Sequence, residues 1–212
     1  PPAYGDESNR YVGAEACRSC HDDAYVRWSS SHHARSMRPP TPSSVVGDFD
    51  DARFVENGIE TRFFERGSGY YVATQAPDGE PKEYAVKYTF GFDPLQQYLL
   101  ELPGGRLQAL TIAWDARPRA EGGQRWFSLY PDEKLAPGDP LHWTGYLQNW
   151  NLQCAHCHSV DLRKRYDVET ATYDTRFAEV NVACESCHGP GKPHVEWAKT
   201  AISFGARPCA RS

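Results

Sequence analysis

Apolar and polar residues alternate along the middle of the chain. From about Thr61 to Tyr130 the pattern has a period of two, which is typical of strands with one buried face. Two glycine-rich turns, Gly67–Gly69 and Pro103–Gly105, separate alternating runs as hairpin turns do. The predicted strands span residues 61–65, 70–74, 84–90, 96–102, 106–114 and 124–130. The pattern therefore predicts an antiparallel β-rich insert.

Helical spacing replaces alternation on both sides of this insert. The run from His21 to Met37 has Tyr25, Trp28 and His32 at intervals of three and four residues, which predicts a helix. The proline-rich run 38–42 ends it. Further helices are expected over Pro140–Leu152 and Pro193–Phe204.

These patterns predict an α+β fold with three segments. An N-terminal segment covers residues 1–45, the β-rich insert covers 46–135, and a C-terminal segment covers 136–212. We expect them to form one integrated domain. The insert contains no cysteine or histidine, so it should shape and shield the chemistry carried by the other two segments, or present an interface.

Three Cys-x-x-Cys-His motifs carry that chemistry, at Cys17–His21, Cys154–His158 and Cys184–His188. This motif is the attachment site of a c-type haem: the two cysteines form thioethers, and the histidine ligates the iron. His21, His158 and His188 are thus the predicted proximal ligands. The predicted thioether residues are Cys17, Cys20, Cys154, Cys157, Cys184 and Cys187. The helical and coil segments should pack on three covalent haems c.

Zinc, a redox dithiol and a structural disulfide are the competing interpretations of the cysteine pairs. Zinc usually takes its histidines from positions that can close a tetrahedron, and a histidine directly after the second cysteine is poorly placed for this. A thioredoxin-like dithiol needs one such motif, not three. With 8 histidines in 212 residues, the probability that all three cysteine pairs are followed by histidine by chance is about 5 × 10⁻⁵.

Five other histidines can supply the sixth ligand of each iron. His33, His142 and His194 are the distal candidates, and His32 is the second choice beside His33. On a continuous helix His32 and His33 would lie about 16–18 Å from His21, so one of them, His33 by preference, should serve a different haem. His156 lies inside a motif and should face solvent. Met37, the single methionine, is an alternative ligand for one iron.

Composition and charge limit which partners the chain can bind and where it can be located. The chain has 212 residues with 40% hydrophobic and 13% aromatic content, a mean hydropathy of −0.68 and a net charge of −5. Without a basic stripe it should not bind nucleic acid, and no apolar run is long enough for a membrane span. Covalent haem attachment implies maturation outside the cytoplasm. We therefore expect a periplasmic or extracellular protein whose signal peptide is absent from this chain.

The first and last motifs resemble those of a known family. Cys17–His21 is followed by Trp28, Ser31, His33 and Met37, and Cys184–His188 is followed by Gly-Pro-Gly and His194. These patterns resemble multihaem cytochromes c related to tetrahaem electron carriers. The resemblance implies that His33 and His194 are distal ligands.

The middle of the chain is similar to the N-terminal part of long multihaem cytochromes with helical repeats. The runs that carry this similarity are 87–91, 95–98, 103–108 and 138–145. Such proteins usually continue into further motifs beginning Cys-Ala-Arg-Cys-His, whereas this chain has Cys209-Ala210-Arg211-Ser212. The chain is thus a short form or a fragment of a longer protein. Cys209 is expected to be a free thiol or to form a disulfide with another subunit.

The chain has enough histidines to give each iron six ligands, which favours an electron carrier over an enzyme. We expect electron transfer through closely packed, mostly bis-histidine haems, to redox partner proteins or neighbouring cytochromes. One alternative is the subunit of a homopolymer, an extracellular filament built through a non-closing interface. Another is a haem oxidoreductase acting on a small nitrogen or sulfur oxyanion, which would need one iron with an open position.

Overall fold

The computed structural model describes residues 10–203, and the chain divides into two compact units. The helical unit comprises residues 1–35, 156–163 and 176–212, and the sheet unit comprises residues 36–155 and 164–175. Cys209 lies outside the described residues. The division into segments 1–45, 46–135 and 136–212 stays a prediction.

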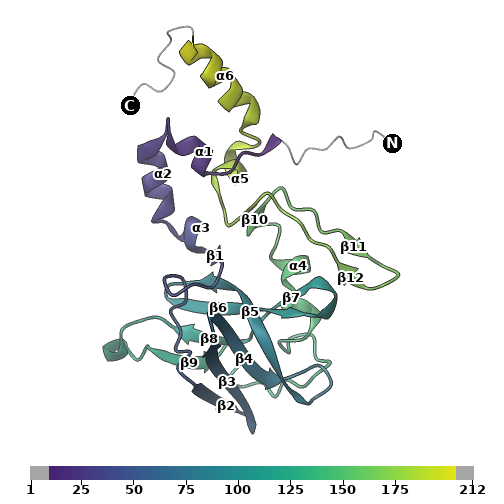
Figure 1. The fold of residues 1–212 in the computed structure, drawn as a ribbon. Helices are drawn as coiled ribbons and strands as arrows, with labels where there is room; N and C mark the ends of the chain where they lie inside the picture. The colour runs from purple at the N-terminus through teal and green to yellow at the C-terminus, as the bar shows by residue number, and fades with distance from the viewer. Residues whose placement is uncertain (1–9, 204–212) are drawn as a thin grey trace. The chain divides into compact units, whose positions relative to one another are not determined.

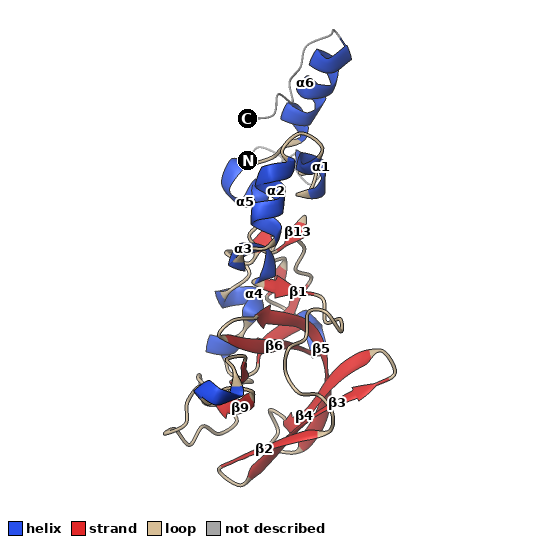
Figure 2. Cartoon of the chain, turned by 90° about the vertical axis from the view of Figure 1, so that its left-hand side faces the viewer, coloured by secondary structure: helices blue, strands red, loops and turns tan. Residues whose placement is uncertain are grey.

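The sheet unit is built on an antiparallel sheet (Figure 1). Within the described residues the sheet has nine strands in the order β2-β3-β4-β5-β6-β8-β9, while β1 pairs with β5 and β7 with β6. Their bounds are β1 Met37–Arg38, β2 Ala52–Glu56, β3 Ile59–Arg66, β4 Gly69–Gln75, β5 Pro81–Gly91, β6 Leu95–Leu102, β7 Arg106–Ala109, β8 Ile112–Asp115 and β9 Arg125–Ser128. Figure 2 shows these strands in red.

The strand predictions are largely confirmed, and the turns explain why. Gly67 has a φ of 63°, which glycine adopts without strain, and it reverses the chain between β3 and β4. At the next turn Gly105 lies so close to a neighbouring hairpin that an added Cβ would be 2.1 Å from the Tyr173 carbonyl oxygen. That hairpin consists of β11, Tyr166–Asp167, and β12, Thr172–Tyr173.

Two features of the sheet differ from the prediction. Strand β2 was not expected, because its run Ala52–Glu56 has no fully buried face. The predicted strand 106–114 is broken into β7 and β8, which pair with different parts of β6. Between them, the Leu110 amide donates a hydrogen bond to the Tyr98 carbonyl (3.0 Å).

The core of the sheet unit is aromatic. Phe49 meets Phe63, Tyr70, Tyr98 and Trp126 edge to face, with ring centroids 5.0–5.7 Å apart. Phe63 also stacks on Trp126 at 3.5 Å. Large apolar side chains from several strands thus bury one another, and burial of this kind stabilises a fold by roughly 25 cal/mol per Å².

The helix predicted over Pro140–Leu152 is shorter than expected. The structure has a 3-10 turn η4, Tyr146–Gln148, and a helix α4, Trp150–Gln153. The Gln108 side-chain amide donates hydrogen bonds to the carbonyls of Trp143 (2.8 Å) and Gly145 (2.9 Å). These bonds hold the segment before η4 as a turn, because its carbonyls are occupied by a strand side chain. Two further 3-10 turns are η2, Pro103–Gly105, and η3, Arg119–Glu121.

The described part of the helical unit consists of short helices and one two-stranded sheet. The helices are α1 Glu15–Arg18, α2 Asp22–Ser29, α3 His32–Arg35, α5 Cys184–His188 and α6 Lys192–Ser203. Strand β10, Ser159–Val160, pairs with β13, Glu179–Val180. Helix α6 agrees closely with the helix predicted from Pro193.

The prediction of one continuous helix from His21 to Met37 is wrong. Helix α2 ends at Ser29, α3 follows after a break, and Met37 begins strand β1. The hydroxyls of Ser30 and Ser31 donate to the carbonyls of Arg27 (3.0 Å) and Trp28 (2.6 Å). Serine side chains compete for helix carbonyls in this way and so favour a helix end.

Among residues 10–203, no helix is long and apolar enough to cross a lipid bilayer.

Candidate haem sites

The first motif forms a single tight turn. The amides of Cys20 and His21 both donate to the Cys17 carbonyl (3.3 and 2.9 Å), and His21 then caps the start of α2. These two bonds bring the backbone of Cys20 and His21 back to that of Cys17. Such a turn lets two thioethers and one imidazole reach the same porphyrin.

The third motif is itself the helix α5. Ser186 caps its start, with the Ala183 amide donating to the Ser186 hydroxyl (3.1 Å). Gly189, with a φ of 77°, ends the helix directly after His188. The motif is therefore held in helical geometry at both ends by its own neighbours.

The second motif begins at the end of α4. The amides of Cys154 and Ala155 donate to the Trp150 carbonyl (3.0 and 2.9 Å) in the sheet unit. In the helical unit, the His158 carbonyl accepts from the Asn181 amide (3.1 Å). Burial lowers the pKa of His158, which favours the neutral imidazole that binds metals.

Within the helical unit, two carboxylates join the first motif to the third. Glu185, which is 5% exposed, accepts hydrogen bonds from the amides of Val12 (3.1 Å) and Gly13 (2.8 Å). Glu179 accepts from the Ala14 amide (3.0 Å), and burial raises the pKa of this carboxyl. Hydrogen bonds to charged acceptors are among the stronger ones in proteins.

This contact between distant parts of the chain was not predicted. Glu185 lies inside a haem motif, where the two residues between the cysteines carry no sequence signal of their own. An isolated glutamate gives no indication that its partners are backbone amides far away in the sequence. The Trp28 indole adds a further bond, donating to the Val182 carbonyl (2.9 Å).

Cysteines of the first and third motifs are also neighbours. The side chains of Cys17 and Cys184 form a hydrogen bond, and burial, then Cys184 and Glu185, raise the pKa of the Cys17 thiol to about 11. Burial likewise raises the pKa of Cys184. Both groups are therefore neutral thiols at physiological pH. Cys17, Cys154, Cys157, Cys184 and Cys187 form no disulfide in the structure.

The distal candidates lie in different surroundings. His32 and His33 are exposed on α3, and His156 is exposed within its motif. His194 is in the first turn of α6, where its ring centroid lies 6.1 Å from that of His21, with 26° between the ring planes. The roles predicted for these histidines stay predictions.

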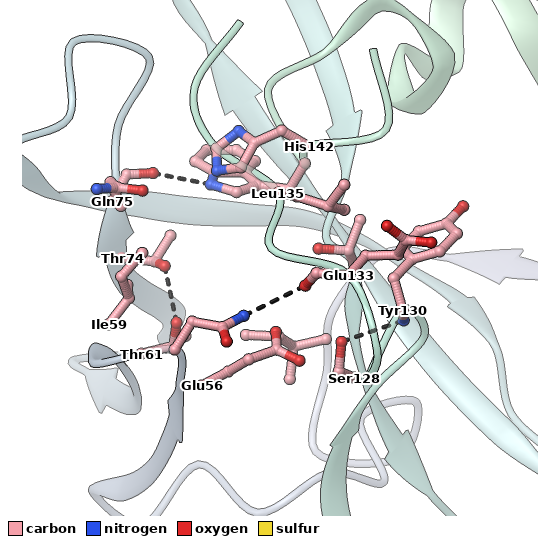
Figure 3. A pocket seen from close by; sticks show the side chains of 14 residues that line it. Glu56, Ile59, Thr61, Thr74, Gln75, Ser128, Tyr130, Glu133, Leu135 and His142 are labelled. Carbon is pink, nitrogen blue, oxygen red and sulfur yellow. Dashed lines mark hydrogen bonds between the residues drawn. The ribbon is translucent and has the colours of Figure 1, made fainter. Parts of the chain in front are cut away.

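His142 lies in the sheet unit, beside a cavity of about 60 Å³ (Figure 3). It is 7% exposed, its Nδ1 is 2.8 Å from the Thr144 hydroxyl oxygen, and burial lowers its pKa. On the same cavity the Trp143 indole donates to the Gln75 carbonyl (2.8 Å). The role of His142 as an iron ligand stays a prediction.

The residues present fit covalent haem. Each of three motifs places a histidine directly after its second cysteine, and the helical unit exposes large apolar side chains. Val26 on α2 and Trp197 on α6 are 53% and 60% exposed. A porphyrin is a large apolar plate that such side chains can cover. The donor set resembles that of multihaem c-type cytochromes.

Comparison with known proteins supports this class. The family model described as cytochrome c554 and c-prime matches residues 16–47 and 141–189, which include all three motifs. The match leaves out most of the sheet, and it ends before His194. No curated protein sequence matches the chain.

A solved structure shares the fold. The chain is similar to the outer cell wall cytochrome OcwA, with a TM-score of 0.57 and 23% sequence identity over 90% of this chain. The alignment covers 34% of the OcwA chain, so this chain spans about a third of that length. The family model thus supports a resemblance to c-type cytochromes, and the solved structure supports the fold.

Proposed function

We propose that the chain binds three haems c and transfers electrons between redox proteins. The observation that carries this proposal is the set of three Cys-x-x-Cys-His motifs whose histidines His21, His158 and His188 all belong to the helical unit. When bound, haem supplies reversible one-electron chemistry. The chain's own task is to hold each iron, to exclude open coordination positions and to set the local charge.

The ligand supply favours bis-histidine irons. Met37 is fully buried in β1, where it lies opposite Phe90 of β5. Its side chain is therefore packed inside the sheet unit. His32, His33, His142 and His194 remain as distal candidates for three irons. Irons with two histidines have no open position for a substrate, and they tend toward lower potentials than irons with methionine. This supports a carrier rather than an enzyme.

Close spacing of the attachment points supports transfer between haems. The hydrogen bond between Cys17 and Cys184 joins the first and third motifs. Haems attached at these two cysteines would be close neighbours. The buried charge of Glu185 lies beside both cysteines, and a nearby negative charge favours the oxidised, more positive iron.

The compartment and partners follow from the same chemistry. Covalent haem attachment implies export, and the similar protein OcwA is by its title an outer cell wall cytochrome. We place this chain outside the cytoplasm, in the periplasm or beyond it. Its partners are redox proteins or neighbouring cytochromes.

Binding of carbon monoxide to the reduced holoprotein tests the carrier against the enzyme. Carbon monoxide needs an open or easily displaced position on ferrous iron, so we expect the visible spectrum to stay unchanged. A spectral shift as large as that of one haem fully bound by carbon monoxide would identify a five-coordinate iron and favour an oxidoreductase. Redox titration of the same sample should give reversible one-electron steps for all the haem present.

A further inference from the structure

We propose that the helical unit couples electron transfer to proton uptake, with the Glu179 carboxylate as the group that takes the proton. When a redox partner delivers an electron to this unit, a proton from solvent binds Glu179, so the net charge of the unit stays the same. This inference rests on the proposed function, because it requires electrons to reach haems attached in the helical unit.

Two carboxylates of the helical unit bind amides of the same stretch of backbone, residues 12–14, but their hydrogen bonding differs. Glu185 is 5% exposed and accepts from three backbone amides at 2.7–3.1 Å. Glu179 accepts from one, the Ala14 amide, at its Oε2 (3.0 Å), and its Oε1 has no donor among residues 10–203. Amide donors stabilise the charged form of a carboxyl. Glu185 therefore stays ionised, while Glu179 has an oxygen that can bind a proton.

The surroundings of Glu179 favour its neutral form. Burial, and more weakly the negative charge of Glu185, raises the pKa of the Glu179 carboxyl, while its single backbone hydrogen bond lowers it. The other titratable groups that interact with Glu179 are the thiols of Cys17 and Cys184 and the Tyr25 phenol, each with a raised pKa. In the described part of the chain, no cation shifts the carboxyl. Within this group, Glu179 is the residue whose protonation can change between acidic and neutral pH.

The charge of Glu179 acts at two of the predicted attachment points for haem. After burial, which is the main cause, the Glu179 carboxylate contributes to the raised pKa of the Cys17 and Cys184 thiols. A charge that disfavours a thiolate at these positions also disfavours an added electron nearby, because both are negative. Linkage is reciprocal, so an added electron favours protonation of Glu179 by the same free energy.

A purely structural role is the competing explanation. Glu179 lies opposite Val160 in the small sheet of β10 and β13, and its bond to the Ala14 amide ties that sheet to the start of the first motif. A glutamine would do the same, because its side-chain oxygen also accepts from an amide. A carboxylate at this position adds repulsion with Glu185. What it gains over glutamine is the ability to bind a proton.

The test compares Glu179→Gln with Glu196→Gln in the mature holoprotein. The glutamine at position 179 can still accept from the Ala14 amide but cannot take a proton. Glu196 is an exposed carboxylate on α6 of the same unit, so its variant controls for the loss of one negative charge. Spectroelectrochemical titrations at a series of pH values give the midpoint potentials. A pH indicator in weakly buffered solution counts the protons taken up on full reduction.

We expect the midpoint potentials of the unmodified protein and of Glu196→Gln to fall as the pH rises through the pKa of Glu179, because protonation favours the reduced state. Glu179→Gln should lose this dependence and take up fewer protons, by up to about one per chain. Haem propionates titrate in all three proteins, so the difference isolates Glu179. Equal proton uptake by the three proteins would overturn the proposal. Failure of the proposed function would appear separately, as haems that are missing or are not reversibly reduced.

Infrared spectroscopy tests the proposal in the unmodified holoprotein, should Glu179→Gln fail to mature. The reduced-minus-oxidised difference spectrum should contain the C=O stretch of a newly protonated carboxyl. Labelling of glutamate with ¹³C should shift this band, which distinguishes a glutamate from a haem propionate. Absence of the band, or a band that does not respond to the label, would also overturn the proposal.

Discussion

The two units of the chain are stabilised in different ways. The sheet unit has its own apolar core, in which aromatic rings such as Phe49, Phe63 and Trp126 pack on one another. In the described part of the helical unit, every buried apolar residue is an alanine or a valine: Ala14, Ala34, Val160 and Ala183. Small side chains bury little area, so they contribute little hydrophobic stabilisation.

Polar bonds and cysteines take the place of a core in the helical unit. Glu179 and Glu185 bind backbone amides near the first motif, and five motif cysteines form no disulfide. Domains too small to bury a sufficient core usually need covalent or metal-based support. We therefore expect haem to contribute to the folding of the helical unit more than to that of the sheet unit. The predictions below separate the two cases.

The largest effect is expected when haem is withheld. In the full chain expressed without haem attachment, amide hydrogen exchange should show residues of the helical unit exchanging without protection, while strands β3 to β6 remain protected. The reason is that the helical unit has few buried apolar contacts of its own, and local stability follows such contacts. Equal protection of both units in the haem-free chain would contradict this account.

Truncation of the sheet core should be the next largest effect. Phe63 is fully buried and stacks on Trp126 at 3.5 Å, so Phe63→Ala should lower the free energy of unfolding by about 3–5 kcal/mol. Urea unfolding followed by far-ultraviolet circular dichroism measures this loss. The haem absorption spectrum should not change. Val55→Ala, at an exposed strand position, is the control and should stay within about 0.5 kcal/mol of the unmodified protein.

Removal of the Glu185 carboxylate should destabilise the helical unit. Glu185→Ala leaves the amides of Val12, Gly13 and Gly191 without their acceptor, which should reduce stability by about 2–3 kcal/mol. Circular dichroism in the haem absorption band, recorded through a urea titration, reports on this unit. Glu196→Ala on α6 is the control. Identical midpoints for the two variants would show that the carboxylate does not hold the motifs together.

The smallest effect is a change in alkaline stability of the sheet unit. Burial raises the pKa of Tyr98, whose hydroxyl donates to the Gln96 Oε1 (2.6 Å). Its neutral form therefore stabilises the fold, fully below the unfolded pKa of about 10 and progressively less as the pH rises beyond it. Tyr98→Phe should show a shallower loss of stability above pH 10, while exposed Tyr146→Phe should match the unmodified protein. Parallel slopes for all three would refute the prediction.

Local patterns made much of this fold predictable. The period of two and the glycine turns place β3 to β6 within a few residues, because both signals are local. The motifs likewise predict their haem chemistry from five adjacent residues. The break after Ser29 was missed, since serine hydroxyls at that point take carbonyls that the spacing of Tyr25 and Trp28 assigns to a helix.

Long-range contacts are what the sequence could not predict. Nothing near Glu185 indicates that it binds the amides of Val12 and Gly13, because backbone amides are alike at every position. The same holds for the ring contact between His194 and His21, whose centroids lie 6.1 Å apart although the residues are distant in sequence. Distal ligands in such a chain depend on tertiary structure.

The intact mass of the mature chain tests the central claim most directly. Covalent haem survives denaturation, so the mass should exceed that of the polypeptide by three haems, and digestion should locate one at each of Cys17–His21, Cys154–His158 and Cys184–His188. Low-spin signals for the same three irons should accompany that mass. A mass of two haems or fewer, or a motif recovered with both thiols unmodified, would contradict it.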